Sequence, residues 1–442
     1  MTEKRQYFIQ TYGCQMNVRD SELVAAQFES LGMSAAVDKA EADVVFVNTC
    51  SVRDKAEQKL YSDLGRLKQW KQNTKKIIVG GCVAQQERQR IAKRAPYVDL
   101  VIGTHQVRDI SRHVIDSEMA ADTQIRTDWK HDDPYQRLGK PDPIVTCKPS
   151  VFVTIQEGCD NVCTFCIVPF TRGREVSRPP EAILSEIESY VKLGAKEVVL
   201  LGQNVNSYGH KFSEFPTFAE LLAQVHQIKG IQRIRFTSPH PKDYGPDVIE
   251  AYQNLPKLCP SAHLPLQAGS DAVLKAMGRG YTSQQYLDIV ADLRRARPDI
   301  HFSTDIIVGF PGETRQDFEQ TLEVMETVRF SQIYAFVFSP RPMTPAHKLK
   351  DKIDLQEKKM WLQELFEQQQ KIQTEDQQYF LNKQVKVLWT EVHDGMLKGR
   401  SAQGRVVHAL GEDKHIGEID DVKIERATAN ALYGYLVPAR NH

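Results

Sequence analysis

Short apolar runs alternate with longer amphipathic stretches through the first 116 residues of the chain. The runs carry the β-branched and aromatic residues that favour strands, and the stretches between them repeat apolar residues at helical spacing. Strands are predicted at 7–11, 43–48, 77–80 and 98–102, and helices at 21–31, 54–70, 85–94 and 107–115. This regular alternation predicts a parallel α/β sheet covered by helices.

The same alternation resumes at residue 151 and continues for six strand–helix units. Strands are predicted at 151–156, 197–202, 231–237, 261–266, 301–308 and 332–338, and the helices between them include 181–193, 218–228, 283–297 and 315–328. Six successive units predict a partial parallel (β/α)6 barrel, in which chemistry belongs to the loops that follow the strands.

Two other stretches break the alternation. Between the α/β regions the apolar periodicity fades into turn-rich polar sequence such as 139–143 (GKPDP), which is typical of a linker. A charged, Gln-rich helical stretch at 355–380 precedes six β-like runs, which predict a small antiparallel β-barrel. The domains are therefore predicted at 1–118, 150–378 and 379–442, with a linker at 119–149.

The charge composition gives no global sign of nucleic-acid binding. In 442 residues, 57 Lys and Arg balance 57 Asp and Glu, so any basic surface must be local. No apolar run approaches the length that spans a bilayer, and the first residues lead into a predicted strand without the apolar core of a signal peptide. We therefore expect a cytoplasmic protein with no membrane partner. In that reducing compartment the eight cysteines indicate metal or catalytic sites rather than disulfides.

Cys159, Cys163 and Cys166 form a CxxxCxxC motif directly after the first predicted barrel strand. Three thiolates on one loop can hold three irons of a 4Fe–4S cluster, and no fourth cysteine lies close enough in the loop for the last iron. That open iron could bind a small molecule through nitrogen and oxygen atoms, so the motif indicates a reactive cluster. A zinc site is the alternative, although zinc sites usually pair two CxxC hooks and close at four ligands.

Three further cysteines occupy equivalent places in the first region, because Cys14, Cys50 and Cys82 each follow a predicted strand. Loops at the carboxyl ends of parallel strands face one crevice, so these thiols can converge on a second metal site. Each could instead be a small buried hydrophobic residue, which is common for free cysteine. Cys147, at the end of the linker, and Cys259, without a partner at ligand spacing, are predicted to be structural.

Polar residues and glycines gather in the loops after the later barrel strands. Each loop alone could be ordinary turn chemistry, but their common position predicts one site at the top of the barrel. His240 and His263 are predicted to be core or supporting residues rather than catalytic ones. The candidates for hydrogen bonds to a polar ligand are Gln203, Ser238, Gln267 and Ser270, and those for neutralising its carboxylate or phosphates are Arg172, Arg174 and Arg279.

A CxxxCxxC motif after the first strand of a partial barrel resembles the radical S-adenosylmethionine (SAM) superfamily. The resemblance implies that the open iron chelates the amino and carboxylate groups of SAM. Electron transfer would then cleave SAM to methionine and a 5′-deoxyadenosyl radical. We expect the residues that bind this cofactor, besides the cysteines, to be Phe165, Gln203, Ser238, Gln267 and Arg279.

The resemblance is closer to one family of that superfamily, the methylthiotransferases. Its amino-terminal domain is similar to residues 10–17 (QTYGCQMN), 48–53 (NTCSVR) and 80–82 (GGC) of this chain. Its barrel is similar to residues 156–159 (QEGC) and 172–179 (RGREVSRP). The resemblance implies that Cys14, Cys50 and Cys82 bind a second 4Fe–4S cluster.

Within the family the chain looks like the branch that modifies tRNA. The resemblance is carried by residues 12–17 (YGCQMN), 171–173 (TRG), 263–271 (HLPLQAGSD) and 338–342 (FSPRP). It implies methylthiolation of carbon 2 of an isopentenylated adenosine next to the anticodon, with the tRNA anticodon stem-loop as partner. Met343 departs from the family's pattern, because related chains often have Gly at this position before Thr-Pro. The difference affects the expected shape of this loop and leaves the cluster assignment unchanged.

The carboxyl-terminal runs, with 398–400 (KGR) and 432–434 (LYG), resemble the TRAM domain, an RNA-binding module of this family. Lys and Arg at loop tips could contact the phosphates of an anticodon stem-loop, whose unpaired bases can be splayed out. A solvated barrel face is the alternative.

These resemblances give the two sets of cysteines separate catalytic roles. Chemistry at an unactivated aromatic C–H bond needs a radical cofactor. One SAM would be cleaved at the cluster of Cys159, Cys163 and Cys166. A second SAM would methylate sulfur at the cluster of Cys14, Cys50 and Cys82. Two 4Fe–4S clusters and two SAM molecules would then serve each turnover, with electrons from an external donor such as flavodoxin or ferredoxin.

Other functions stay open at this point. A methylthiotransferase that acts on an aspartate of a ribosomal protein would share both sets of cysteines, and another relative would modify threonylcarbamoyl-adenosine in tRNA. A non-enzymatic alternative is an RNA-binding iron–sulfur redox sensor, which would need no SAM.

Overall fold

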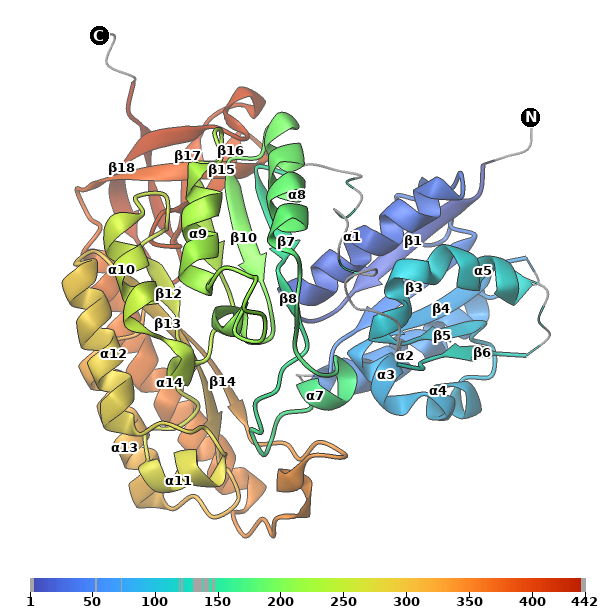
Figure 1. The fold of residues 1–442 in the computed structure, drawn as a ribbon, viewed down its shortest axis with the longest axis horizontal. Helices are drawn as coiled ribbons and strands as arrows, with labels where there is room; N and C mark the ends of the chain where they lie inside the picture. Colours follow the sequence, from blue (N-terminus) through green and yellow to red (C-terminus); the bar gives the residue numbers. More distant parts are fainter. Residues whose placement is uncertain are drawn as a thin grey trace. The chain divides into compact units, whose positions relative to one another are not determined.

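The computed structural model divides into two compact units (Figure 1). It describes residues 4–438 except 52–53, 73, 119, 121, 130–137, 139–141, 143 and 145–147, so Cys147 lies outside the described residues. The first unit comprises Met1–Thr146, Glu157–Asn161 and Ile167–Ala182, and the second comprises Cys147–Gln156, Val162–Cys166 and Ile183–His442.

The first unit is built on a parallel sheet of six strands in the order β2-β1-β3-β4-β5-β6. The strands are β1 (Gln6–Thr11), β2 (Ser34–Ala35), β3 (Val44–Thr49), β4 (Lys76–Gly81), β5 (Leu100–Ile102) and β6 (Gln124–Arg126). The helices are α1 (Gln15–Ser30), α2 (Asp54–Trp70), α3 (Cys82–Glu87), α4 (Gln89–Arg94), η1 (Thr104–Asp109), α5 (Ile110–Glu118) and α7 (Val168–Thr171), with a short strand β9 (Val176–Ser177). The predicted parallel α/β sheet is therefore confirmed.

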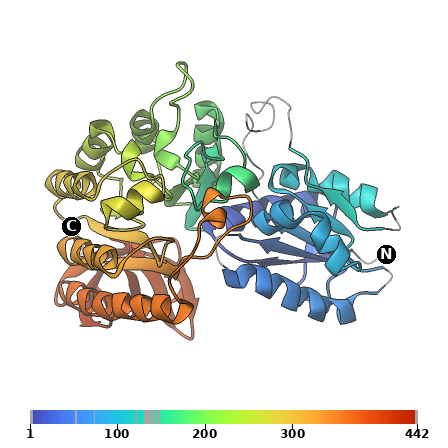
Figure 2. The same cartoon turned by 90° about the horizontal axis from the view of Figure 1, so that it is seen from below.

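Strand β3 shows why helices cover both faces of this sheet (Figure 2). Side chains alternate across a strand, so Val44 and Phe46 join one apolar core while Val45 and Val47 join the other. The first core also takes residues of α1 and α5, and the second takes residues of α2, α3 and α4. All six residues of β3 are buried, as expected for a central parallel strand.

Two sequence predictions in this unit need correction. The predicted helix 85–94 is two helices, α3 and α4, because Arg88 between them has a φ of 48°, outside the helical region. Part of the predicted linker forms a strand, since Gln124–Arg126 pairs with Leu100–Ile102 at the sheet edge. A three-residue edge strand carries too little apolar periodicity to be recognised from the pattern.

The second unit contains six parallel barrel strands in two three-stranded sheets, ordered β11-β10-β7 and β12-β13-β14. The strands are β7 (Ser150–Thr154), β10 (Glu197–Leu201), β11 (Arg233–Phe236), β12 (Ser261–His263), β13 (His301–Val308) and β14 (Gln332–Val337). The helices that follow are α8 (Pro180–Lys192), α9 (Phe218–Gln227), α10 (Pro246–Asn254), α11 (Asp271–Ala276), α12 (Ser283–Ala296) and α13 (Arg315–Val328). A short strand β8 (Gln156–Glu157) follows β7, and helices α9, α10 and α12 lie outside the strands (Figure 1).

Local sequence explains where these helices begin. Thr217, Thr282 and Thr314 precede α9, α12 and α13, and each threonine hydroxyl accepts a hydrogen bond from a backbone N–H in the first turn. The third residue of each helix returns a side-chain hydrogen bond to the backbone of the cap, which completes a capping box. The predicted helix starts at 218, 283 and 315 agree with these caps.

The second unit ends in helix α14 (Leu355–Gln378) and a closed five-stranded barrel in the order β15-β16-β17-β19-β18. Its strands are β15 (Gln384–His393), β16 (Met396–Ser401), β17 (Val406–Leu410), β18 (Ile419–Ala427) and β19 (Leu432–Leu436). The predicted small barrel is confirmed, with two differences. It has five strands where six β-like runs were predicted, and β17 and β19 pair in parallel, while the other neighbours are antiparallel. No helix in the described part of the chain is long and apolar enough to cross a membrane.

Candidate active site

Cys14, Cys50 and Cys82 lie at the carboxyl ends of three adjacent strands in the first unit. Cys14 precedes α1 after β1, Cys50 follows β3 directly, and Cys82 is the first residue of α3 after β4. The strand order reverses between β1 and β3, because the chain turns from β1 to the edge strand β2 before it adds β3 on the other side. In open α/β sheets, the crevice at such a reversal is where ligands bind.

Side-chain hydrogen bonds tie the three cysteine-bearing loops together. The Asn17 Nδ2 donates to the backbone oxygens of Tyr12, at 3.0 Å, and Thr49, at 2.8 Å. The Thr49 hydroxyl donates to the Gly80 carbonyl, at 2.6 Å. Gly13 allows the closest approach, since its φ is +109° and an added Cβ would lie 2.7 Å from the Cys50 Sγ. These bonds fix the loops without using the thiols.

A buried arginine from the segment after the CxxxCxxC motif faces this set of thiols. The Arg172 Nη2 donates to Asp20 Oδ2, at 2.5 Å, and to Asn17 Oδ1, at 3.3 Å. The same Asn17 oxygen accepts a hydrogen bond from the Cys14 Sγ, at 3.6 Å. Arg172 is 6% exposed, so its charge acts in a poorly solvated environment.

The pKa values of two thiols reflect these neighbours. A hydrogen bond from Cys50, together with the charge of Arg172, lowers the pKa of Cys14 to about 6 although burial opposes this. Burial raises the pKa of the Cys82 thiol, against the opposing influence of Arg172, which also bonds its sulfur. One guanidinium therefore acts on both thiols.

The described residues hold no group of three His, Cys, Asp or Glu side chains arranged for a single metal ion. A 4Fe–4S cluster makes a different demand, because its cysteines bind separate irons and need not surround one point. Cys14, Cys50 and Cys82 lie on neighbouring strand ends, two of their thiols interact directly, and a cation supports their thiolate forms. This arrangement fits a cluster better than a single ion.

The CxxxCxxC motif contributes residues to both units, with Cys159 in the first and Cys163 and Cys166 in the second. In the first unit, the Cys159 N–H donates to the Gly173 carbonyl, at 3.2 Å, and the Cys159 Sγ accepts from the Asn161 N–H, at 3.4 Å. In the second unit, the Cys166 N–H donates to the Cys163 carbonyl, at 3.0 Å. All three cysteines lie on loops rather than in helices or strands.

Two side chains of the second unit contact the Cys163 sulfur. The Arg279 Nη1 donates to it at 3.3 Å, and the His240 Nε2 lies 3.9 Å away. The His240 Nδ1 accepts from the Lys242 N–H, at 3.3 Å, so Nε2 carries the ring proton and points its N–H at the sulfur. Burial, with Arg279 and Lys242 nearby, lowers the pKa of His240 to about 2, which keeps the ring neutral.

The predicted SAM-binding residues lie at strand ends of the second unit. Gln203 follows β10 and its N–H donates to the Gln156 Oε1, at 2.9 Å. Ser238 follows β11, is exposed, and its carbonyl accepts from the Val205 N–H, at 3.2 Å. Gln267 follows β12 and bonds β13 through its backbone, with its N–H 2.8 Å from the Asp305 oxygen. Ser238 and Gln267 have φ values of 59° and 70°, which few non-glycine residues adopt.

Other predicted residues have partners that explain their position. Arg279 binds the Cys163 sulfur as well as the Pro265 carbonyl, at 3.1 Å, so it joins the loop after β12 to the cysteine motif. The Ser270 hydroxyl donates to Asp317, at 2.5 Å. Phe165 lies half-buried in the turn between Cys163 and Cys166.

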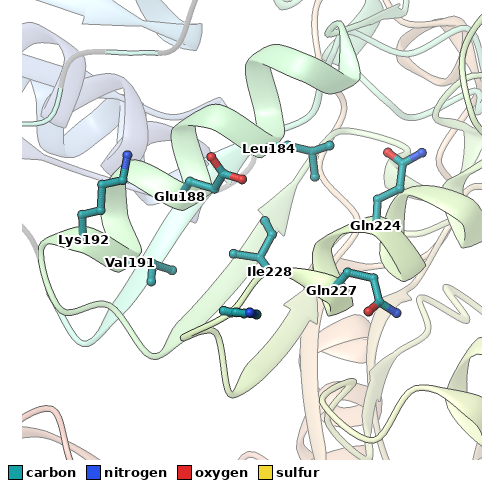
Figure 3. Close-up of a pocket in the computed structure, with 8 residues that line it drawn as sticks. Leu184, Glu188, Val191, Lys192, Gln224, Gln227 and Ile228 are labelled. Atoms are coloured by element: carbon teal, nitrogen blue, oxygen red, sulfur yellow. The ribbon is translucent and has the colours of Figure 1, made fainter.

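A hollow of about 470 Å³ lies elsewhere in the second unit, between helices α8 and α9 (Figure 3). It is lined by Leu184, Glu188, Val191, Lys192, Gln224, Gln227, Ile228 and Lys229. Glu188, Val191 and Lys192 belong to the carboxyl half of α8, and Gln224 and Gln227 to that of α9. Both helix ends lead into the amino ends of the next strands. The hollow is therefore at the opposite end from the loops that carry chemistry in this type of barrel.

Sequence reasoning missed two residues that structure the sites. Asp20 was not recognised although it lies three residues after Asn17 on the buried side of α1, a spacing that places both on one helix face. Tyr281, whose hydroxyl lies 3.2 Å from the Arg279 Nε, was also missed. A buried polar residue within an apolar helix face was the available signal for Asp20.

Comparison with known proteins defines the class of this chain. Residues 153–325 match the radical SAM superfamily, and residues 6–103 match a family described as "Uncharacterized protein family UPF0004". The fold is similar to that of a radical SAM methyltransferase, TsrM from Kitasatospora setae, with a TM-score of 0.54, 11% identity and coverage of 78% of this chain and 77% of the other. The chain thus contains a radical SAM domain, a class that uses a 4Fe–4S cluster and SAM.

Its relatives identify the family more closely. A protein of Geobacter metallireducens named tRNA-2-methylthio-N(6)-dimethylallyladenosine synthase is 44% identical over 99% of each chain. One of Syntrophotalea carbinolica with the same name is 42% identical over 97% of this chain and 99% of its own length. The chain belongs to the family of these synthases.

Proposed function

We propose that this chain is a cytoplasmic radical SAM enzyme that inserts a methylthio group at carbon 2 of isopentenylated adenosine next to the anticodon of tRNA. The observation that carries the proposal is the full-length similarity to synthases named for that product, at 42–44% identity. The fold supports it, since both α/β regions and the terminal barrel are parts of one chain with the matched radical SAM domain.

Two sets of cysteines would divide the work. When bound, a cluster on Cys159, Cys163 and Cys166 would supply the electron that cleaves SAM, and a cluster on Cys14, Cys50 and Cys82 would supply sulfur. The chain's own contribution is to hold these thiols in their loops and to exclude water from them. Cys50, Cys82, Cys159 and Cys163 are all buried, which supports this role.

Charged and polar side chains would set the environment of each cysteine set. Arg279 and the neutral His240 direct N–H groups at the Cys163 sulfur, and such bonds stabilise a thiolate ligand. Gln203, Ser238 and Gln267 remain candidates for orienting SAM, because they share the strand ends where ligands bind in this architecture. Phe165, inside the motif, is a candidate for packing against the same cofactor.

The proposal needs two partners. The substrate is the anticodon stem-loop of an isopentenylated tRNA, for which the terminal barrel is the candidate contact surface. An external donor such as flavodoxin or ferredoxin would deliver electrons, two SAM molecules would be used per turnover, and two clusters would be present.

The modified nucleosides of a deletion strain test the proposal. Bulk tRNA from that strain, digested and measured by mass spectrometry, is expected to lack methylthio-isopentenyladenosine and to accumulate isopentenyladenosine. Expression of the full chain should restore the product, and expression of the Cys163→Ala chain should not.

The other outcomes distinguish the rival functions. The deletion strain could instead keep methylthio-isopentenyladenosine and lose either a methylthiolated aspartate of a ribosomal protein or methylthio-threonylcarbamoyl-adenosine. Either result would show that the enzyme is a methylthiotransferase with a different substrate. An unchanged nucleoside profile and no SAM cleavage by the reduced protein would favour the redox sensor.

A further inference from the structure

Arg172 follows the CxxxCxxC motif by six residues, yet it is built into the first unit beside the other cysteine set. Its guanidinium bonds Asp20 and Asn17, and the same Asn17 oxygen accepts a hydrogen bond from the Cys14 Sγ. The sequence suggested that Arg172 neutralises a ligand carboxylate or phosphates. Its contacts point instead to an internal carboxylate and to sulfur.

The backbone around Arg172 is fixed from both sides. Its N–H donates to the Val168 carbonyl, at 2.7 Å, which closes helix α7. Its carbonyl accepts from the His105 Nε2, at 3.0 Å, and the preceding carbonyl of Thr171 accepts from the Thr104 hydroxyl, at 2.5 Å. Gly173 then turns with a φ of +82°. A long side chain on a fixed backbone loses less conformational entropy when it is held in one place.

The acceptors also fix the direction of the guanidinium. The Asn17 Nδ2 is committed to carbonyl oxygens, so its Oδ1 faces both Arg172 and Cys14. Asp20, also buried, takes the other edge of the guanidinium through both oxygens, at 2.5 and 3.4 Å. The cation is therefore aimed at the thiol set by residues of the helix that begins after Cys14.

The buried Arg172–Asp20 ion pair is not explained by a contribution to stability alone. Taking two charges out of water carries a large desolvation penalty, which the pair offsets only with further favourable contacts. Thiolates that ligate iron supply such contacts, because they are anions close to the same guanidinium. Reduction of a cluster adds one more negative charge at the site.

We propose that Arg172, held in place by Asp20 and Asn17, is a positioning residue that favours the reduced state of the cluster on Cys14, Cys50 and Cys82. This inference rests on the proposed function, in which that cluster supplies sulfur. The guanidinium does not exchange protons or bonds in the step. An external reductant supplies one electron, and the nearby positive charge stabilises the added negative charge.

The test measures a reduction potential and needs neither SAM nor tRNA. The full chain with Cys159→Ala, Cys163→Ala and Cys166→Ala is the parent, since it can carry a cluster only on the first unit. Iron content and the reduction midpoint, followed by electron paramagnetic resonance, are measured for the parent and for Arg172→Met. In Arg172→Met the equilibrium constant for reduction of the cluster is expected to fall about tenfold, which lowers the midpoint potential by about 59 mV for one electron.

Two further variants give the test a direction. Arg172→Lys keeps the charge without the fork of donors and should recover at least half of the shift. Asp20→Asn removes the counter-charge and should move the potential the opposite way, to a more positive value. Arg90→Met is the matched control, because its side chain is 73% exposed in the same unit and its loss should leave the potential unchanged.

The outcomes separate this inference from the proposed function. A parent that binds no cluster contradicts the two-cluster function and this inference with it. A parent with a full cluster whose potential is the same in Arg172→Met and Asp20→Asn, at equal iron content, overturns the inference alone. If Arg172→Met does not fold, Asp20→Asn decides, and an unchanged potential in that variant at equal iron content overturns the inference.

Discussion

A buried arginine lies beside each of the two cysteine sets, but the positive charges of these two arginines are neutralised to different extents. Arg172 in the first unit is paired with the carboxylate of Asp20. Arg279 in the second unit donates to the Pro265 carbonyl and lies 3.2 Å from the Tyr281 hydroxyl, both of which are neutral. The positive charge of Arg279 beside Cys163 is therefore less neutralised than that of Arg172 beside Cys14 and Cys82. Two sites with the same number of thiols can thus differ in electrostatic environment, because the groups that bond their arginines differ in charge.

The surroundings of the two sets differ in the same sense. Helix α1, which begins after Cys14, carries Arg19, and this arginine shares the buried carboxylate of Asp142 with Arg108 and Arg178. Around Cys163 the contacts are the Arg279 guanidinium and the neutral His240, whose ring packs edge-on 5.7 Å from that of Tyr281. The arginine of the first site is paired with a buried carboxylate, whereas the arginine of the second has neutral oxygen partners.

The largest expected effect separates the two sets chemically. Cys163→Ala should abolish both 5′-deoxyadenosine formation and the methylthio product, because it removes the thiol that SAM cleavage needs. Cys14→Ala should abolish the product but keep 5′-deoxyadenosine formation. Chromatography of both products from reduced, reconstituted protein checks this, with Cys259→Ala as a control that keeps both. Loss of 5′-deoxyadenosine formation in Cys14→Ala, with an intact cluster on Cys159, Cys163 and Cys166, would contradict the division of roles.

The next effect concerns the ion pairs beneath the first set. Asp142→Ala leaves the buried Arg19 and Arg178 without their shared carboxylate and should destabilise the first unit by about 3–5 kcal/mol. Hydrogen exchange of peptides from α1 measures the loss. Asp116→Ala breaks an exposed pair with Arg112, at 4.0 Å, and should cost less than about 1 kcal/mol. Equal effects of the two variants would show that the buried network contributes nothing.

One buried carboxyl group in each unit, Glu313 and Asp142, should respond to pH in the opposite direction to the other. In the second unit, burial raises the pKa of Glu313 to about 7, although the N–H groups of Gly309 and Phe310 favour its ionised form. Its contribution to stability is therefore full below pH 4.5 and is lost as the pH rises through about 7, by up to about 3 kcal/mol. In the first unit, the arginines lower the pKa of Asp142, whose contribution is lost as the pH falls below the unfolded value of 3.8.

Exchange protection of residues 309–313, corrected for intrinsic rates, should fall between pH 5 and pH 8. Glu313→Gln should remove that dependence while it leaves the protection of α1 unchanged. A pH-independent protection in the parent chain would mean that the Glu313 carboxyl is not perturbed.

The smallest effect sharpens the comparison of the arginines directly. In a chain with Cys14→Ala, Cys50→Ala and Cys82→Ala, Arg279→Met should lower the reduction equilibrium of the remaining cluster by tenfold or more, about 1.4 kcal/mol. The shift should exceed that of Arg172→Met in its own background, because Arg279 acts without a carboxylate partner. A smaller shift for Arg279 would reverse the comparison.

Local pattern predicted the strands that carry the cysteines and the helix starts at 218, 283 and 315. Such features depend on residues close in sequence, so periodicity and capping residues reveal them. The placing of Cys14, Cys50 and Cys82 after neighbouring strands followed from the same pattern.

Long-range pairing explains what the sequence did not reveal. Asp142 lies in a polar, turn-rich stretch, and only the fold brings it to three arginines from distant segments. Arg172 was expected near a ligand of the barrel, yet its partner Asp20 is 152 residues away. Neither pairing produces a periodic pattern in the nearby sequence, so neither could be predicted from that pattern.

The interleaving of the two units sets the order in which the chain can fold during synthesis. The first unit draws on Glu157–Asn161 and Ile167–Ala182 as well as the residues before 147, and Arg172 is in the last of these segments. Domains usually fold as they leave the ribosome, from the amino terminus onward. Here the sheet can form early, but Asp20 must wait for its arginine until the segment ending at residue 182 has emerged. The first unit is thus completed only while the second is already being made.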